Sequence, residues 1–289
     1  MTDQPQIKQI EDTTRSHTVV SVDAMGGDNG PATVVAGLAR CAKKDPSLRF
    51  ILHGQASVLT PLLDRRRLGG VVELRDCAGV VEMADKPSQV LRSGKDTSMW
   101  SCIEAVRTGD ADVAVSCGNT GALMAISMIR LRKVDGVNRP AIACLWPSRN
   151  PSGFNVMLDV GADIRADEHD LLQYAMMGAS YARNGLDLET PRVGLLNVGT
   201  EEHKGRAELK VAHELLRRAA KKSKLDYVGF VEGGDIPSDK VDVIVTDGFT
   251  GNVALKTGEG TASLIRDFLG KAFRHTPLSR LAALLALPS

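Results

Sequence analysis

Five segments of the sequence end an apolar run with a cluster of glycines and polar side chains. The first is DAMGGD at residues 23–28, which follows the run TVVSV and precedes Pro31. Glycines let the backbone approach a ligand or adopt a positive φ, and the first amides of a following helix can hold an anion. We therefore predict a binding turn that contains Asp23, Gly26, Gly27 and Asp28. A plain connection, capped by Asp28 or Asn29, fits the same pattern equally well.

Four later segments repeat this combination, at residues 117–121 (CGNTG), 159–163 (DVGAD), 197–205 (NVGTEEHKG) and 247–252 (DGFTGN). Each follows a run of apolar residues and most precede a helical pattern. Helix caps or loop braces are the ordinary alternative roles for such polar residues. The further candidates in these turns are Asn119, Thr120, Gly121, Asp159, Asn197, Thr200, Glu201, Lys204, Asp247, Gly248, Thr250, Gly251 and Asn252.

The elements that carry these turns alternate between strand and helix. Continuous apolar runs predict strands at 17–22, 49–54, 71–77, 112–117, 141–145, 155–160, 192–198, 227–231 and 241–246. Helical patterns lie between many of them, at 31–43, 87–109, 120–132, 168–184, 203–221 and 251–271. This alternation predicts an α/β fold in which a mostly parallel sheet is sandwiched between helices. The carboxyl ends of parallel strands share one sheet edge, so we expect the five turns to converge there.

We predict a polar leader at residues 1–17, one compact α/β unit at 18–275 and an amphipathic tail at 276–289. A split near residue 145 is the alternative to a single unit. The chain has 289 residues and a formal net charge of +1, which gives no indication of a nucleic-acid partner. Five scattered cysteines without a C-x-x-C pair, together with the polar leader, favour a cytoplasmic protein with free thiols.

Several common chemistries lack their usual motifs. The sequence contains no G-x-G-x-x-G, no G-x-x-x-x-G-K-[ST], no G-x-S-x-G and no H-E-x-x-H. The six histidines show no metal-ligand spacing, so we predict no metal site. Cys117 lies where a strand meets a helix, a place that stabilises a thiolate, but no histidine near it in the sequence supports a nucleophilic role.

The sequence closely resembles the bacterial phosphate acyltransferases of phospholipid synthesis over about residues 18–270, in five motifs that come in the same order: 23–28, 118–122, 158–162, 197–205 and 247–252. The resemblance implies a fold similar to the phosphotransacetylases and isocitrate-dehydrogenase-like enzymes. It implies transfer of a long-chain acyl group from acyl carrier protein to inorganic phosphate, without a cofactor. It also implies a homodimer, whose acyl phosphate product a membrane acyltransferase passes to glycerol 3-phosphate.

Inorganic phosphate is itself a nucleophile, so such an enzyme mainly positions it and stabilises the oxyanion of the tetrahedral intermediate. On this basis the residues expected to take part in the chemistry are Asp23, Asn119, Asn197, Lys204 and Asp247. A bracing role for Asp23 and Asp247 is equally compatible. The segment 85–99 also matches the family, and its Lys95 is a candidate phosphate ligand, although such cations also occur on solvated helix faces. The family commonly has alanine at Cys117 and asparagine at Asp163.

The tail places Leu281, Leu284 and Leu285 on roughly one helical face. Such a stripe is typical of a core or dimer contact. Here the resemblance implies contact with the inner membrane surface, by a peripherally bound protein. Family members usually continue beyond this point, so we expect a truncated chain. Three alternatives stay open: a short-chain, coenzyme-A-dependent phosphotransacetylase, a metal- and NAD-dependent dehydrogenase with Asp242 and Asp247 as ligands, and a non-catalytic acyl-carrier-binding protein.

Overall fold

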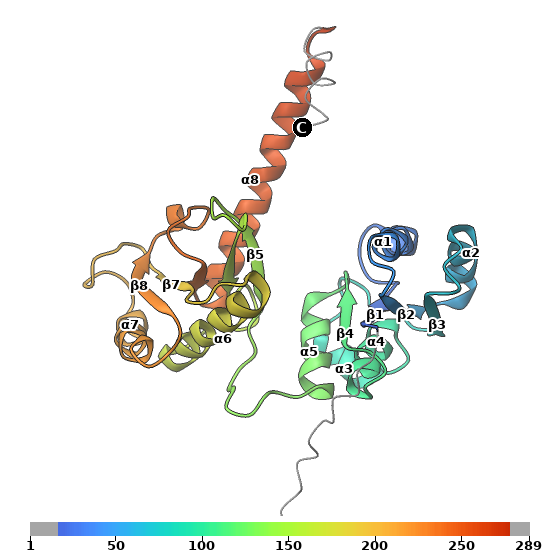
Figure 1. Ribbon diagram of the computed structural model, residues 1–289, viewed down its shortest axis with the longest axis horizontal. Helices are drawn as coiled ribbons and strands as arrows, with labels where there is room; N and C mark the ends of the chain where they lie inside the picture. Colours follow the sequence, from blue (N-terminus) through green and yellow to red (C-terminus); the bar gives the residue numbers. More distant parts are fainter. Residues whose placement is uncertain (1–16, 278–289) are drawn as a thin grey trace, which may run out of the picture. The chain divides into compact units, whose positions relative to one another are not determined.

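The computed structural model describes residues 17–277, which divide into two compact units with the boundary between Lys133 and Val134. Figure 1 labels the elements of each unit. The sequence favoured a single α/β unit, with a split near residue 145 as the alternative. Each unit has its own sheet, its own covering helices and its own buried cluster of apolar side chains.

The first unit is built on a parallel four-stranded sheet with the order β3-β2-β1-β4. The register pairs Asp23, at the end of β1, with Ser116, at the end of β4. The strands are β1 (Val19–Asp23), β2 (Arg49–Gly54), β3 (Val72–Asp76) and β4 (Val113–Ser116). The helices are α1 (Gly30–Lys44), α2 (Ala56–Arg66), α3 (Pro87–Ser93), α4 (Ser98–Arg107) and α5 (Thr120–Arg130).

Helices cover both faces of this sheet, α1 and α2 on one face and α4 on the other (Figure 1). Helix α2 was not predicted from the sequence, and Pro61 lies inside it. Leu59 and Leu63 of α2 are buried in the core, so tertiary packing outweighs the low helix propensity of proline. The helical region predicted at 87–109 is two helices, because the chain turns at Gly94 and α4 starts anew with Thr97 as its N-cap.

The second unit contains a five-stranded sheet with the order β5-β6-β9-β7-β8. Only the edge strand β5 is antiparallel to its neighbour, so the prediction of mostly parallel sheets is confirmed. The strands are β5 (Ala143–Pro147), β6 (Phe154–Leu158), β7 (Arg192–Leu196), β8 (Asp226–Val231) and β9 (Val243–Val245). The helices are α6 (Glu168–Leu186), α7 (Ala207–Ala220) and α8 (Gly248–Arg274), with a 3-10 turn, η1 (Gly233–Asp235).

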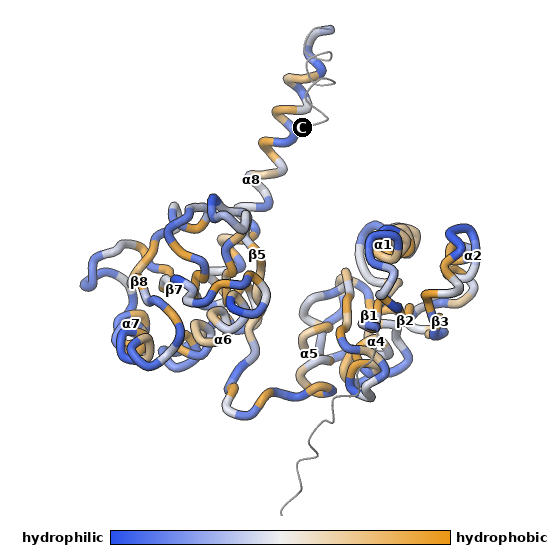
Figure 2. The backbone as a smooth tube through the Cα atoms, in the orientation of Figure 1, coloured by the Kyte–Doolittle hydropathy of each residue, from blue (hydrophilic) through white to orange (hydrophobic). Residues whose placement is uncertain are grey.

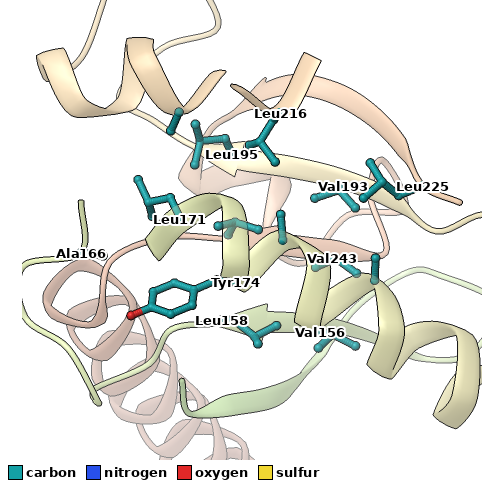
Figure 3. Packing of buried hydrophobic residues seen from close by; sticks show 14 of the residues in the cluster. Val156, Leu158, Ala166, Leu171, Tyr174, Val193, Leu195, Leu216, Leu225 and Val243 are labelled. Carbon is teal, nitrogen blue, oxygen red and sulfur yellow. The ribbon is translucent and has the colours of Figure 1, made fainter. Parts of the chain in front are cut away.

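The core of the second unit lies between its sheet and helices α6 and α7. Tyr174 of α6 is fully buried, and Leu195 and Val243 of the strands belong to the same cluster (Figure 3). Met157 and Ile244 point to the other face of the sheet, where Leu255 of α8 packs against them. Farther along α8 hydrophobic and hydrophilic residues alternate (Figure 2), and Leu264 and Phe268 are more than half exposed, at 52% and 59%.

The expectation that all five polar turns meet at the edge of one sheet is wrong, because they belong to two sheets. The turns after β1 and β4 lie in the first unit, and those after β6, β7 and β9 lie in the second. A continuous apolar run identifies a buried strand but does not say which strand it pairs with. The predicted membrane-contact residues Leu281, Leu284 and Leu285 lie outside the described residues. Within residues 17–277, no helix has the length and apolarity needed to cross a membrane.

Candidate functional site

In the first unit, Asp23 holds two polar turns together. Ser116 Oγ donates a hydrogen bond of 2.7 Å to Asp23 Oδ2, and the Met25 amide donates one of 3.2 Å to Oδ1. The Gly118 amide in turn donates to Ser116 Oγ at 3.1 Å. Asp23 is only 2% exposed, so its carboxylate connects the ends of β1 and β4 from inside the protein. The turns at 23–28 and 117–121 are therefore neighbours, as the sequence predicted.

Gly26 and Gly27 are required by the packing between these two turns. A Cβ on Gly26 would lie 2.8 Å from Asp23 Oδ2 and 2.8 Å from the Gly118 Cα. Gly27 has a φ of +96°, and a Cβ there would lie 2.9 Å from the Cβ of Cys117. Larger residues at either position would push the two turns apart.

Asn119 is a structural anchor at the start of α5. Its side-chain oxygen caps the helix by accepting from the Ala122 amide at 3.0 Å. Its Nδ2 donates to the carbonyl oxygens of Glu82, Met83 and Asp85, at 3.3, 3.1 and 2.9 Å. The side chain is 8% exposed and its hydrogen-bonding groups are occupied within the protein, so it holds the segment 82–85 against α5.

The amino end of α5 nevertheless keeps free hydrogen-bond donors. Within the described residues, the amides of Thr120 and Gly121 have no acceptor, because the cap takes the amides of Ala122 and Leu123. Thr120 is exposed and carries a hydroxyl group at the same place. Two free amides at a helix amino end favour a bound anion.

The remaining candidates of the first unit lie outside this arrangement. Asp28 is exposed after the glycine turn and forms no ion pair within the part of the chain described. Lys95 is exposed in the turn between α3 and α4, and the structure shows no bond from its side chain to the Asp23 or Asn119 turns among residues 17–277. Cys117 is an exposed free thiol next to Gly27.

In the second unit, the Asp159 carboxylate organises the turn after β6. Its Oδ1 accepts from the amides of Ile142, Gly161 and Ala162, at 2.9, 3.1 and 3.0 Å. Its Oδ2 accepts from the amides of Ala162 and Asp163, at 3.1 and 2.7 Å. Asp159 is fully buried, and its two carboxyl oxygens accept hydrogen bonds from four backbone amides. We therefore interpret Asp159 as a brace for its loop.

Asp247 caps α8 and forms an ion pair. Its Oδ1 accepts from the Thr250 amide at 2.9 Å, and its Oδ2 accepts from the Thr250 hydroxyl at 2.8 Å and from Arg206 Nη2 at 2.5 Å. Burial raises the pKa of this carboxyl group, but the bonds from Thr250 and Arg206 outweigh it and leave the pKa below its ordinary value. Asp247 is 2% exposed and ionised, whereas the Arg206 side chain is 58% exposed.

Close contacts join the three polar turns of the second unit. The Gly248 amide donates to the Asp163 carbonyl oxygen at 2.8 Å, and Asn252 Nδ2 donates to the Val160 carbonyl oxygen at 3.2 Å. These bonds place the start of α8 against the Asp159 turn. Arg206, at the end of the 197–205 turn, connects the third turn through its ion pair with Asp247.

The 197–205 turn is held by internal bonds. Asn197 Nδ2 donates to the Lys204 carbonyl oxygen at 3.2 Å, while Asn197 Oδ1 is buried without a partner among the described residues. Lys204 Nζ lies 2.8 Å from Glu201 Oε1, and this hydrogen bond raises the pKa of Lys204 and lowers that of Glu201. Lys204 is therefore already paired with a carboxylate, and Thr200 is exposed beside it.

Two polar residues at these turns were missed by the sequence analysis. Ser116 looked like an ordinary strand residue, and only the β1–β4 register places its hydroxyl against Asp23. Arg206 directly follows the Lys204-Gly205 pair, so its positive charge beside this turn was evident from the sequence. Its pairing with Asp247 was not. Arg206, rather than Lys204, is the guanidinium or ammonium group that reaches the cap of α8.

Other acidic candidates are engaged by arginines. Asp163 Oδ2 lies 2.9 Å from Arg139 Nη1, and Asp242 accepts from the Arg192 side chain at 2.8 and 3.0 Å. In residues 17–277, no three His, Cys, Asp or Glu side chains are grouped so that they could hold a metal ion. Asp242 and Asp247 thus serve ion pairs in this structure.

The architecture places the protein in the phosphotransacetylase class of α/β folds. A phosphotransacetylase from Staphylococcus aureus aligns with a TM-score of 0.59 and 16% identity, over 86% of this chain and 83% of that one. A phosphotransacetylase from Streptococcus pyogenes aligns with a TM-score of 0.59 and 17% identity, over 85% of this chain and 82% of that one. At these identities the likeness shows a shared fold, which confirms the predicted fold class.

Sequence comparison then identifies the family. The family described as "Fatty acid synthesis protein" matches residues 18–289. A phosphate acyltransferase from Jannaschia sp. (strain CCS1) is 74% identical over 273 residues, which cover 94% of this chain and 75% of the relative. One from Dinoroseobacter shibae is 72% identical over 273 residues, covering 94% of this chain and 71% of the relative. The chain belongs to this family of phosphate acyltransferases and is an acyltransferase enzyme.

Proposed function

We propose that the chain transfers a long-chain fatty acyl group from the thioester of acyl carrier protein to inorganic phosphate, which gives an acyl phosphate for phospholipid synthesis. The observation that carries this proposal is the 74% identity, over 94% of the chain, with a relative named phosphate acyltransferase. The family description, which refers to fatty acid synthesis, supports a fatty acyl group. The amino end of α5 and the Arg206 guanidinium add groups suited to binding an anion.

The reaction we propose is a direct attack. A phosphate oxygen forms a bond to the thioester carbonyl carbon, the tetrahedral intermediate carries the negative charge on the former carbonyl oxygen, and the carbon–sulfur bond breaks. The thiolate leaves and takes up a proton. Amide donors stabilise such an oxyanion without rearranging during the reaction. The Thr120 and Gly121 amides, together with the Thr120 hydroxyl, are the donors we assign to phosphate or oxyanion in the first unit.

The buried acids and amides have a supporting role in this scheme. Asp23, Asp159 and Asp247 are 2%, 0% and 2% exposed and have amide, hydroxyl or guanidinium partners. We propose that they fix the glycine turns and that Asn119 and Asn197 position the chain beside them. Such residues act through the groups that they hold in place.

The second unit has candidate substrate contacts of its own. We assign phosphate or substrate contact there to Arg206, with Lys204, Thr200 and Glu201 in the adjacent turn. The turn at the start of α8 approaches closely because it has glycine at 248 and 251, where a Cβ would meet Asp159 or Asp163. Thr250 stabilises the close packing of this turn through its hydrogen bond to Asp247, and Asn252 does so through its hydrogen bond to the Val160 carbonyl oxygen.

Replacing Thr120 by proline tests the amide donors of α5 directly. Proline is tolerated at the first helical position, and the ψ of 107° at Asn119 is compatible with a following proline. Thr120→Pro removes one amide donor and the hydroxyl, whereas Thr120→Ala removes only the hydroxyl. By analogy with loss of an oxyanion donor, we expect Thr120→Pro to lower kcat by about 100-fold beyond the effect of Thr120→Ala. Equal activities in the two variants, with intact folding, contradict this assignment.

The donor specificity is tested by measuring acyl phosphate formation from a long-chain acyl carrier protein and from acetyl coenzyme A. We expect phosphate-dependent turnover of the carrier-protein donor. Exclusive use of acetyl coenzyme A identifies a short-chain phosphotransacetylase instead. Carrier binding without turnover of either donor identifies a binding protein. A requirement for NAD and a divalent metal identifies a dehydrogenase.

We also propose a homodimer formed through the exposed apolar side of α8 near residues 264–269. Leu264, Ile265, Phe268 and Leu269 are 52%, 52%, 59% and 51% exposed, and their spacing places them along one side of the helix. Contact with a second copy of the chain removes this apolar side from water. Light scattering of Phe268→Asp beside the unchanged protein tests this: we expect a dimer for the unchanged chain and a shift to monomer for the variant.

We propose that the enzyme works in the cytoplasm, at the inner membrane surface, where a membrane acyltransferase consumes the acyl phosphate to acylate glycerol 3-phosphate. The support is the apolar stripe of the tail, residues Leu281, Leu284 and Leu285, which lie outside the described residues. Flotation with liposomes, with and without residues 277–289, measures the contact. Equal flotation of both chains contradicts a role for the tail.

A further inference from the structure

Positive charge is concentrated in one part of the first unit. Residues 30–67 contain seven Lys and Arg residues but only two acidic residues, a formal charge of +5 in a chain whose net charge is +1. The remainder of the chain is therefore net acidic, at −4. Such a local imbalance produces a positive potential toward solvent. Six of these cations lie on helices α1 and α2 or at the end of α2: Arg40, Lys43, Lys44, Arg65, Arg66 and Arg67.

These six side chains are exposed to solvent. None of them forms an ion pair with a carboxylate among the described residues, whereas Arg75, Arg107, Arg130, Arg192 and Arg206 all do. The only acids in the same stretch are Asp45 and Asp64. Within the described part of the chain, the first unit thus presents cations without a carboxylate partner on two helices that pack against each other.

A groove between the two helices brings part of this charge to the amino end of α1. A cavity of about 410 Å³ is lined by Ala32 and Val35 of α1 and by Leu62, Arg65 and Arg66 of α2. Lys43 lies eleven residues after Ala32, which is about three turns along the same side of α1. The groove and this side of α1 form the basic surface, defined by Lys43, Arg65 and Arg66.

The helix itself adds to the positive potential. Asn29, at the N-cap of α1, makes no side-chain cap hydrogen bond, and the first turn of α1 has no acidic residue. The uncapped amides of a helix amino end carry partial positive charge. This end directly follows the glycine turn at 23–28, so the basic surface is continuous in sequence and structure with a turn assigned to the site.

We propose that the basic surface docks the acidic protein that carries the acyl thioester, with Lys43, Arg65 and Arg66 facing its carboxylates. The inference rests on the proposed function, which supplies an acyl carrier protein as the donor. Charge complementarity favours an acidic partner, and the position of the groove beside the start of α1 places that partner next to the glycine turn. Contacts of this kind mainly accelerate encounter and weaken steeply with salt.

The test measures binding of fluorescently labelled holo-acyl carrier protein by anisotropy, at low and high salt. The variant Lys43→Glu/Arg65→Glu/Arg66→Glu reverses the charge of the surface, and Lys43→Gln/Arg65→Gln/Arg66→Gln removes it with less disturbance. The control Lys221→Glu/Lys222→Glu reverses two cations at the carboxyl end of α7, in the second unit. Circular dichroism and the thermal midpoint verify that each variant is folded.

We expect the reversal to weaken carrier binding by about tenfold or more at low salt, the neutral variant to weaken it less, and the control to leave it unchanged. Carrier binding that is equal in all four proteins overturns the proposal. Loss of binding to vesicles of anionic phospholipid, with carrier binding retained, also overturns it and identifies a membrane surface instead.

Measuring acyl phosphate formation distinguishes failure of the docking inference from failure of the proposed function. If the unchanged chain binds the carrier through this surface but makes no acyl phosphate, the docking inference stands and the proposed function fails. If the chain makes acyl phosphate and the reversal leaves the KM for the acyl carrier protein unchanged, the proposed function stands and the docking inference fails.

Discussion

Asp247→Asn distinguishes a carboxylate that supports the start of α8 from one that moves a proton. Asparagine caps a helix as well as aspartate does, so its Oδ1 still accepts from the Thr250 amide. Its Nδ2 replaces the oxygen that accepts from the Thr250 hydroxyl and from Arg206. The bond from Arg206 is lost, because Nδ2 and the guanidinium are both donors, whereas the Thr250 hydroxyl turns and accepts from Nδ2.

The size of the effect follows from these two bonds. A hydrogen bond to a charged group contributes about 1.5–3 kcal/mol and one between neutral groups about 1 kcal/mol, so the Thr250 bond weakens by about 1 kcal/mol when its partner becomes a neutral amide. The Arg206 side chain is 58% exposed, so solvent screening reduces its share to about 1 kcal/mol. We therefore expect Asp247→Asn to lower the free energy of unfolding by about 2 kcal/mol. As a positioning group, Asp247 should change kcat by less than about tenfold, whereas a general acid or base contributes about 100-fold to 10,000-fold.

Urea unfolding and acyl phosphate kinetics measure the two quantities on the same preparation. Arg206→Gln removes the ion pair but leaves the cap, so it is the matched variant for a double-mutant cycle. We expect a coupling of about 1 kcal/mol between Arg206 and Asp247. An Asp247→Asn protein of unchanged stability, with kcat lowered more than about 100-fold, refutes this reasoning and places Asp247 in the chemistry.

Three further predictions concern the first unit. Gly26→Ala places a Cβ 2.8 Å from Asp23 Oδ2 and should lower the free energy of unfolding by about 1–3 kcal/mol, as measured by thermal unfolding. In the control Gly37→Ala the new Cβ meets nothing within 4 Å, and the free energy of unfolding should rise by up to about 1 kcal/mol. Burial, aided by Arg75, lowers the pKa of His53 from 6.5 to about 4, so folding opposes its protonation. The free energy of unfolding, measured by urea titration, should therefore fall by about 3 kcal/mol from pH 6.5 to pH 4. His53→Gln should abolish this loss. Cys117→Ala should retain most of the acyl phosphate formation measured for the unchanged chain, and near-total loss contradicts direct attack by phosphate.

The alternation of strands and helices was predictable because burial imposes its pattern directly on the sequence. The run at 49–54, for example, predicted β2 to the residue. The pairing of strands was not predictable in this way. Strands β4 and β6 contain similar apolar residues, although they belong to different sheets. As a result, turns from two sheets were assigned to one edge.

The location of the candidate residues was predictable, but their use was less so. Glycine at 26 and 27 already indicated a close backbone approach, and Asp23 was correctly placed beside that approach. Whether a polar side chain faces a ligand or a neighbouring loop depends on tertiary contacts that the sequence does not show. Asn119 illustrates this, because its three carbonyl partners lie more than thirty residues away.

The most direct test of direct acyl transfer to phosphate measures free carrier thiol and acyl phosphate together, starting from a long-chain acyl carrier protein with and without inorganic phosphate. Direct attack by phosphate predicts equal amounts of thiol and acyl phosphate when phosphate is present, and no thiol release in its absence. Either of two results contradicts it: no acyl phosphate with phosphate present, or release of one thiol per enzyme without phosphate, which would indicate a covalent acyl-enzyme.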